Sequence, residues 1–203
     1  NLLNCIPGDE ALAAQMQPPD IFWGSPRGLT YDNGDLYILD PQTNAVWIFR
    51  NRDTTNAPRL FFGEEIPPMQ DVIDLAVNQN DLYLLHADGH MTTCVYSGLL
   101  ESPTRCEDPA TYTDSRAGRQ NGSFIQDATF SEILFAPPPD PSVYLLDPDE
   151  KAIYHFSARL TLQRQYRSRN PLPASPATAI TIDKNSRTLF LALGNQVYSA
   201  VLP

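Results

Sequence analysis

The chain has few basic residues and no long hydrophobic run. Lysine and arginine together number 14 against 24 aspartates and glutamates, which leaves a net charge of −10. This acidity argues against a nucleic-acid partner and offers no polybasic patch for anionic lipid. No apolar stretch reaches the roughly 18 residues that a membrane-spanning helix needs. The first residues lack the basic region of a signal peptide, so we expect any targeting segment to have been removed or to lie outside this sequence.

Cysteine is scarce as well, with three in 203 residues. Cys94 and Cys106 enclose eleven residues, and Gly98 and Pro103 allow the chain to turn back between them. We predict a disulfide here and, with it, an oxidising extracytoplasmic compartment. The alternative is a pair of buried free thiols, since the spacing lacks the Cys-x-x-Cys pairing of a zinc site. Cys5 is then left free or paired outside the chain.

Helix-forming stretches are also rare. Nineteen prolines are about twice the average usage and predict many loops and short regular elements. The exception is residues 9–16, where Asp9 is placed to cap a short helix. A hydrophobic content of 42% is that of a globular chain, so the composition favours an all-β fold.

What the chain does contain is a repeat. Residues 39–47 and 146–154 both read Leu-Asp-Pro-x-x-x-Ala followed by a β-branched and an aromatic residue. Two weaker copies complete four units, whose equivalent positions are Leu29, Leu75, Ile133 and Ile180. The spacings between these positions are 46, 58 and 47 residues, and each unit holds three or four short strands parted by turn residues. Such a period predicts the blades of a β-propeller.

The best-preserved unit also resembles a known group. Residues 28–40 read Gly-Leu-Thr-Tyr-Asp-Asn-Gly-Asp-Leu-Tyr-Ile-Leu-Asp, and residues 45–49 read Ala-Val-Trp-Ile-Phe after a turn. This pattern resembles the NHL/YVTN group of propellers, which includes extracytoplasmic sensor propellers of bacterial receptor kinases. The resemblance implies an all-β propeller or propeller segment with about four blades of antiparallel strands. It is unspecific for activity, because the group contains both binding platforms and enzymes.

The repeat also divides the chain. We predict blades over residues 26–70, 71–127, 128–175 and 176–203. Residues 1–25 are predicted to hold the tail of a preceding blade together with the short helix. The fourth unit lacks an outer strand. Either residues 1–25 supply that strand and close the ring, or the chain is a piece of a larger propeller.

Several polar residues fall at turns. Asp40 and Asp147 occupy equivalent positions and are predicted to accept backbone N–H groups of the following hairpin. His86 and His90 flank a turn that contains Asp88, so a tight hairpin could bring the two imidazoles together. These three residues would make a partial zinc or copper site. No third firm ligand is apparent nearby in the sequence, so we predict no metal site.

A propeller hydrolase is the alternative function. Calcium-dependent lactonases share the architecture, and their ligands and general base would here come from Glu64, Glu65, Asn78, Asn80 and Asp183. The spacing of these residues does not repeat. The chain also lacks a Gly-x-Ser-x-Gly elbow, a phosphate-binding glycine-rich loop and a His-Glu-x-x-His helix. We therefore predict no catalytic residue and no cofactor; an axial channel could hold calcium, but nothing in the sequence indicates it.

The long second spacing marks an insertion. The excess falls within residues 107–123, a polar stretch that holds Tyr112, Arg116 and Arg119. Loops on a rigid scaffold often carry binding, so these three are the predicted binding residues; a plain surface excursion is the alternative. We predict a non-catalytic extracytoplasmic interaction platform, or an accessory subunit of a larger surface or membrane assembly, that presents loops to a protein or another ligand.

Overall fold

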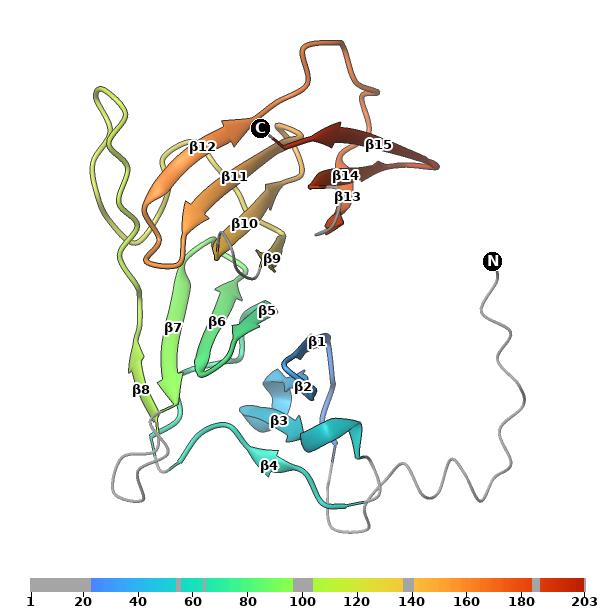
Figure 1. Ribbon diagram of the computed structural model, residues 1–203. Helices are drawn as coiled ribbons and strands as arrows, with labels where there is room; N and C mark the ends of the chain where they lie inside the picture. Colours follow the sequence, from blue (N-terminus) through green and yellow to red (C-terminus); the bar gives the residue numbers. More distant parts are fainter. Residues whose placement is uncertain are drawn as a thin grey trace.

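The strands of this protein form four antiparallel sheets. The computed structural model describes residues 23–53, 56–63, 65–96, 104–136, 141–183 and 187–202. Within these residues the four sheets stand around a common centre as the blades of a β-propeller (Figure 1). The predicted all-β fold with four blades is confirmed.

The first two blades have four strands each. The first contains, from the centre outward, β1 (Gly28–Asp32), β2 (Asp35–Asp40), β3 (Ala45–Phe49) and β4 (Arg59–Leu60). Two short 3-10 helices, η1 (Pro41–Thr43) and η2 (Arg50–Arg52), follow β2 and β3. The second blade contains β5 (Val72–Asn78), β6 (Asp81–His86), β7 (Met91–Tyr96) and β8 (Thr104–Glu107).

The last two blades differ in their number of strands. The third contains β9 (Glu132–Ala136), β10 (Ser142–Asp147), β11 (Ala152–Ser157) and β12 (Leu162–Tyr166). The fourth contains, among the described residues, only β13 (Ala177–Asp183), β14 (Thr188–Leu193) and β15 (Gln196–Val201). Consecutive strands pair antiparallel in every sheet, as short connections require. The blade limits predicted from the sequence stay predictions.

Tight turns join strands where the sequence predicts them. Asn33 and Gly34 link β1 to β2 with φ angles of 46° and 96°, the left-handed region that asparagine and glycine tolerate best. Gly89 between β6 and β7 has a φ of 93°, and Gly194 between β14 and β15 has a φ of 55°. These three turns therefore close hairpins, each with glycine or asparagine at positive φ.

The two equivalent aspartates fix turns in different ways. Asp147 accepts a hydrogen bond from the amide of Glu150 over 3.1 Å, as the repeat predicts. The carboxylate of Asp40 accepts a hydrogen bond from the backbone amide of Thr43, which follows β2 as the repeat predicts. It also accepts hydrogen bonds from the amides of Gly24, at 2.7 Å, and Ser25, at 2.8 Å, which precede the first blade. Asp40 therefore also holds the entering chain to the blade, a role that the repeat pattern did not predict.

Apolar side chains fill the spaces between consecutive blades. Three clusters do so, each with members from two blades: Val46 and Leu84, Leu85 and Phe156, and Leu146 and Leu191. Full burial of one such side chain stabilises a fold by about 2 kcal/mol. The contacts between blades therefore hold the ring together, because a single sheet exposes both of its faces.

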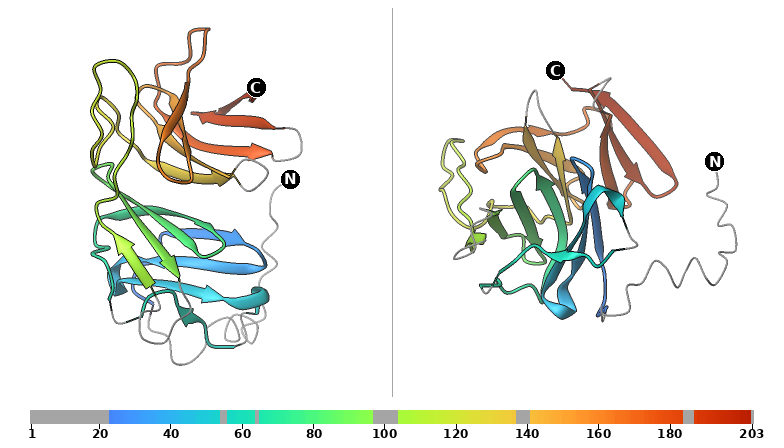
Figure 2. Two further views of the ribbon diagram at one scale, coloured as in Figure 1. Left: turned by 60° about the vertical axis from the view of Figure 1, so that its left-hand side comes forward. Right: turned by 60° about the horizontal axis from the view of Figure 1, so that its bottom comes forward.

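Among the described residues, the ring is open between the first and the fourth blade. β1 contacts β5, β5 contacts β9 and β9 contacts β13, whereas the described parts of β13 and β1 make no comparable contact. Figure 1 and the left view of Figure 2 show the fourth blade (red) standing apart from the first (blue). Closure by residues 1–25 stays a prediction, since residues 1–22, with the predicted helix at 9–16 and Cys5, lie outside the described residues.

The cysteines of the second blade are joined. Cys94 of β7 and Cys106 of β8 face each other in the register and form a disulfide, as predicted. Its loop is short, with a sequence separation of 12 residues. In the part of the chain that the structure describes, no helix has the length and hydropathy needed to cross a membrane.

Candidate functional site

The insertion after the disulfide packs against the second and third blades. Tyr112 pairs with Gly122 in an isolated β-bridge. Thr113 pairs with Thr161, which immediately precedes β12 of the third blade. Tyr112 is fully buried, and its hydroxyl donates a hydrogen bond of 3.2 Å to the carbonyl of Gly89. The insertion is thus fixed to the β6–β7 turn and to the third blade.

The two predicted arginines contact carboxylates within the insertion or just after it. Arg116 lies with its Nη2 2.6 Å from Oδ2 of the buried Asp114. The hydrogen bonds that the Arg116 side chain and backbone amide donate to Asp114 hold the pKa of its carboxyl below its usual range, although burial opposes the shift. The Arg116 guanidinium also lies 5.8 Å from the centre of the Tyr154 ring. Arg119 pairs with the exposed Asp127 over 2.8 Å.

The structure therefore places Tyr112, Arg116 and Arg119 in contacts that hold the insertion together. The two arginines still reach solvent, whereas Tyr112 does not. Binding of a ligand by these three residues stays a prediction. If it occurs at this face, the arginines are the members that can take part.

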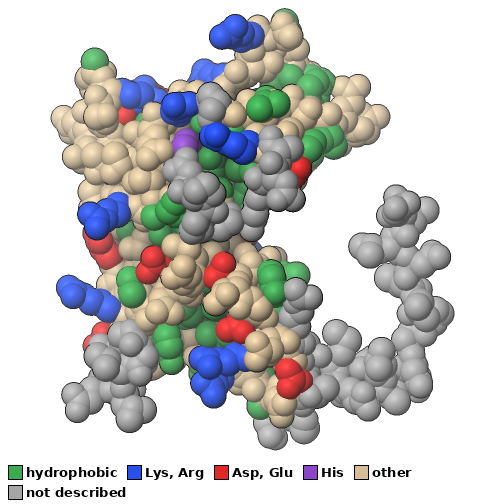
Figure 3. Space-filling model, viewed as in Figure 1, with side chains coloured by type: hydrophobic (Ala, Val, Ile, Leu, Met, Phe, Trp, Pro, Cys, Tyr) green, Lys and Arg blue, Asp and Glu red, His purple; other side chains and the backbone are tan. Residues whose placement is uncertain are grey.

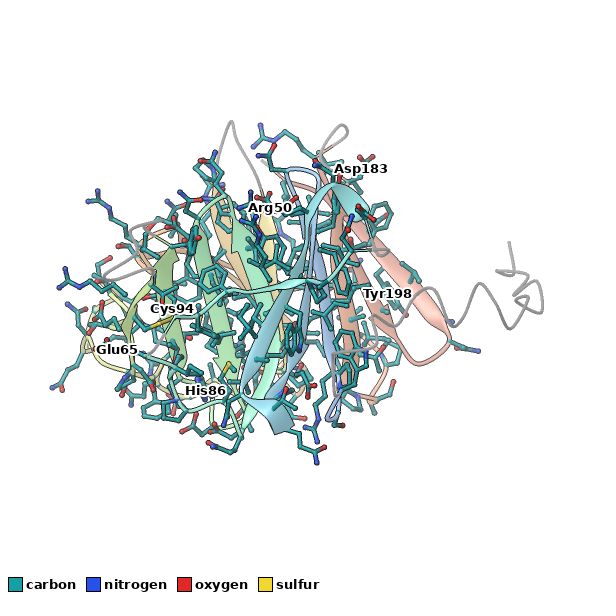
Figure 4. The ribbon with its side chains drawn as sticks, turned by 90° about the horizontal axis from the view of Figure 1, so that it is seen from below. Arg50, Glu65, His86, Cys94, Asp183 and Tyr198 are labelled. Carbon is teal, nitrogen blue, oxygen red and sulfur yellow. A yellow bond between two sulfur atoms is a disulfide. The ribbon has the colours of Figure 1, made fainter. Side chains whose placement is uncertain are left out.

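Two stacked imidazoles lie beside the insertion. His86 ends β6 and His90 precedes β7, and their ring centres are 3.8 Å apart with an angle of 19° between the planes. The tight hairpin that the sequence predicts brings them together. Figure 4 shows His86 at one end of the propeller and Arg50 and Asp183 at the opposite end.

His86 is held at both ring nitrogens. Its Nδ1 lies 2.8 Å from Asp71 Oδ1, and its Nε2 lies 2.9 Å from Thr92 Oγ1. The side chain of His86 is 1% exposed, whereas that of Asp71 is 51% exposed. A buried imidazole is therefore hydrogen-bonded to a carboxylate at the surface.

His90 lies between two carboxylates. Its Nδ1 is 2.6 Å from Asp88 Oδ1, and its Nε2 is 3.3 Å from Asp108 Oδ1. Burial raises the pKa of the Asp88 carboxyl, but hydrogen bonds from the amide and ring of His90 outweigh burial and leave it below its ordinary value. Asp108 belongs to the insertion, and Phe124, immediately after it, meets the His90 ring edge to face at 6.2 Å. Insertion and hairpin therefore share this cluster.

Asp71 is the member of the cluster that the sequence reasoning missed. It stands immediately before β5, and the pairing of Val72 with His86 brings it beside the imidazole. Pairing the residues of β5 and β6 one by one, starting from the turn between them, could have indicated which residue lies beside His86. A bulge between Val72 and Asp74 shifts the register, however, so the count alone would miss by one residue. Within the described ranges, Asp71, His86 and His90 are the one group of three whose ligand atoms all lie within 4.8 Å of one another.

Two acidic residues near the centre have a structural use. Asp74 accepts a 2.9 Å hydrogen bond from the amide of Ile133, and Glu132 accepts one of 2.8 Å from the amide of Ile180. Burial raises the pKa of Glu132 to about 7; the Asp74 carboxylate raises it further, while the Ile180 amide lowers it. Both side chains join the inner strands of consecutive blades.

The residues considered for a hydrolase do not converge in the described structure. Asn78 ends β5 and Asp183 ends β13, while Asn80 lines a cleft between the first two blades. Glu65 is an exposed residue of the segment before β5, and Glu64 lies outside the described residues. Within the same ranges, no group of three close His, Cys, Asp or Glu ligands includes Glu65 or Asp183.

The blade faces at the ring opening carry exposed apolar side chains. Leu29 on β1 is 69% exposed, and Val197 and Val201 on β15 are 69% and 75% exposed. Side chains alternate between the two faces of a strand. Gly28 faces the second blade, so Leu29 lies on the other face of β1. Tyr198 packs toward the third blade, so Val197 lies on the other face of β15. Figure 3 shows hydrophobic side chains at the surface on both sides of the opening. These are the faces that a further blade would cover.

Comparisons with known proteins identify the fold alone. No protein-family model and no curated protein matches the chain. Among solved structures, the chain is similar to the β-propeller domain of Cps50 (Swd1) from Myceliophteria thermophila, with 11% identity, a TM-score of 0.57 and coverage of 88% of this chain and 54% of that chain. It is also similar to a catalytically inactive virginiamycin B lyase from Staphylococcus aureus with Quinupristin, with 13% identity, a TM-score of 0.51 and coverage of 88% and 70%.

A designed protein is similar over nearly its whole length. The computationally designed Ika4 protein gives 12% identity and a TM-score of 0.51, with coverage of 91% of this chain and 95% of that chain. The chain spans only about half, 56% and 54%, of the first two natural propellers that it matches. At such identities the likeness establishes the β-propeller and transfers no activity.

Proposed function

We propose that this chain is a non-catalytic, extracytoplasmic interaction platform of the NHL/YVTN kind that binds a protein partner at its ring opening. The observation that carries the proposal is the exposure of Leu29, Val197 and Val201 on the two blade faces that border the opening. Each Å² of apolar surface removed from water contributes about 25 cal/mol. Apolar sheet faces in a soluble protein commonly mark the place where another polypeptide packs.

The chemistry of the opening favours a partner that presents a strand or a sheet. The fourth blade has three described strands where the others have four, so β15 is an outer strand with an unpaired backbone edge in the part that the structure describes. An added strand can satisfy such an edge while its side chains pack on the adjoining face. The net charge of −10 favours a partner whose rim is basic.

The disulfide supports the proposed compartment. Cys94 and Cys106 are bonded, and such bonds form and persist mainly outside the reducing cytosol. A platform in that compartment serves as a sensor domain or an accessory subunit of a surface assembly.

Site-specific photo-cross-linking tests the proposal. A benzophenone amino acid is placed at position 29, at position 197 or, as a control, at the exposed position 159 on the third blade. We expect positions 29 and 197 to cross-link the same protein and position 159 to give no such product. The purified partner should then bind the wild-type chain and lose binding to a Val197→Lys variant.

Two outcomes would contradict the proposal. One is a monomeric chain that cross-links nothing at 29 or 197, with amides of β1 and β15 already protected from exchange. The other is calcium-dependent lactone turnover by the purified chain, which would favour the hydrolase.

A further inference from the structure

We propose that Asp71, His86 and His90 bind a divalent transition-metal ion of the zinc class. Their ligand atoms lie within 4.8 Å of one another, on the side chains that the β5–β6 and β6–β7 hairpins bring together. The site is independent of the ring opening, because it lies at the β6–β7 turn of the second blade. It adds a ligand of defined chemistry to the proposed platform.

The donor set selects the metal. Two imidazole nitrogens and one carboxylate oxygen are the protein ligands of many zinc centres, with the fourth position left to water or another group. Calcium and magnesium prefer sets made only of oxygen. Imidazole donors instead suit zinc, cobalt, nickel and copper. Zinc is the member of this class that is best matched by the mixed nitrogen and oxygen donors.

The surroundings of His86 orient it for such a role. Thr92 Oγ1 lies 2.9 Å from His86 Nε2, so the hydroxyl can accept the proton of that nitrogen. The lone pair of Nδ1 is then directed toward Asp71, whose Oδ1 is 2.8 Å away. A metal ion replaces the proton that otherwise lies between these two atoms. A hydrogen bond to the second ring nitrogen is the usual means by which proteins fix a histidine ligand.

The carboxylates around His90 favour a bound cation. A neutral imidazole carries one N–H, and the 2.6 Å contact to Asp88 takes it. The other nitrogen then faces the carboxylate of Asp108 as a second acceptor, 3.3 Å away. Three carboxylates, those of Asp71, Asp88 and Asp108, thus contact two rings. A divalent ion offsets this concentration of negative charge.

The site is accessible, and a tetrahedral ion requires the ligand atoms to draw together and the stacked His90 ring to turn its lone pair toward that of His86. Ligand atoms around tetrahedral zinc are roughly 3.4 Å apart, given bonds of about 2.1 Å. The side chain of Asp71 is 51% exposed and that of His90 is 16% exposed, whereas His86 is 1% exposed. The two outer ligands can therefore close on the fixed His86 from the solvent side.

Zinc and cobalt titrations of the whole chain test the proposal. The protein is purified with its disulfide intact, without a histidine tag, freed of metal with a chelator, and carries Cys5→Ser so that no thiolate competes. We expect one zinc ion per chain by calorimetry, a higher melting temperature with zinc, and visible Co²⁺ absorption that zinc abolishes. His90→Gln and Asp71→Asn should each weaken zinc binding by at least ~10-fold. Both positions reach the surface, so these variants should keep the fold, which circular dichroism checks.

Asp149→Asn is the matched control, since Asp149 is an exposed carboxylate of the third blade. It should leave zinc binding unchanged. The proposal is overturned if zinc does not saturate one site at about 100 µM, or if both ligand variants bind zinc as tightly as the wild type does.

Discussion

The carboxylate of Glu132 on β9 accepts a hydrogen bond of 2.8 Å from the backbone amide of Ile180 on β13. Asp74 on β5 makes the equivalent bond, 2.9 Å long, to Ile133 on β9. Each bond links one inner strand to the next around the ring. The first blade has Gly28 at the equivalent position, so it offers no side-chain carboxylate there.

Glu132 should make stability depend on pH. Burial first, and then the nearby Asp74, raises its pKa from 4.5 to about 7. The folded chain therefore holds the proton more tightly than the unfolded chain, and stability falls as the pH rises from about 4.5 through about 7. Glu132→Gln keeps an oxygen acceptor for the Ile180 amide and removes the titration. It should raise stability at pH 8 by about 1–2 kcal/mol, after allowance for solvent screening.

Urea unfolding of the two proteins at pH 5 and pH 8 measures this effect. Glu65→Gln, the same exchange at an exposed position before β5, serves as the control and should leave the pH dependence as it is in the wild type. Equal pH dependence in the wild type and Glu132→Gln would show that this carboxyl does not titrate with folding.

The disulfide should contribute to stability mainly through the unfolded chain. Cys94 and Cys106 close a loop with a sequence separation of 12 residues. Replacing both by serine should lower the free energy of unfolding by about 3 kcal/mol. Urea unfolding with and without reductant checks this, and reductant should leave the serine variant unaffected. A reductant-insensitive wild type, with Cys94 and Cys106 both found as free thiols by mass spectrometry, would contradict the bond.

The two arginines of the insertion should differ in their effect. Arg116→Ala leaves the buried carboxylate of Asp114 without its partner and removes the contact with Tyr154. We expect a loss of about 2–3 kcal/mol. Arg119→Ala removes a pair with the exposed Asp127 and should cost under about 1 kcal/mol. Thermal unfolding measures both, and equal losses would mean that the Asp114 pair is not buried in solution.

Gly24 should be needed for the entry into the first blade. A Cβ added there would lie 2.8 Å from Asp40 Oδ1 and 2.8 Å from the Cβ of Gln42. Gly24→Ala should therefore displace the chain from Asp40 and cost about 1–3 kcal/mol. Gly122→Ala is the matched control, because nothing lies within 4 Å of a Cβ at that position. Circular dichroism melts of both variants test this, and an unaffected Gly24→Ala protein would argue against the Asp40 contact.

Much of the fold could be predicted because its rules are local. Alternating and apolar runs predict the strands, and dipeptides such as Asn33-Gly34 predict the hairpin turns through their tolerance of positive φ. The Cys94–Cys106 pair could be predicted from its spacing. The repeat of the strand and turn pattern then predicted four blades. The candidate metal site was only half predictable: His86 and His90 flank one turn, but Asp71 reaches them through the register of another strand and a bulge.

The sequence by itself determined the strands, the turns, the fourfold repeat and the approach of two histidines across one hairpin, since each depends on residues close together in the chain. Tertiary structure alone decided which side chains meet between hairpins. In the folded chain Tyr112 is buried, Arg116 pairs with Asp114, and Asp71 contacts His86. The faces of the first and fourth blades are exposed at the opening. Those outcomes depend on how blades stack and on where a bulge shifts the pairing, and no local pattern of residues encodes either.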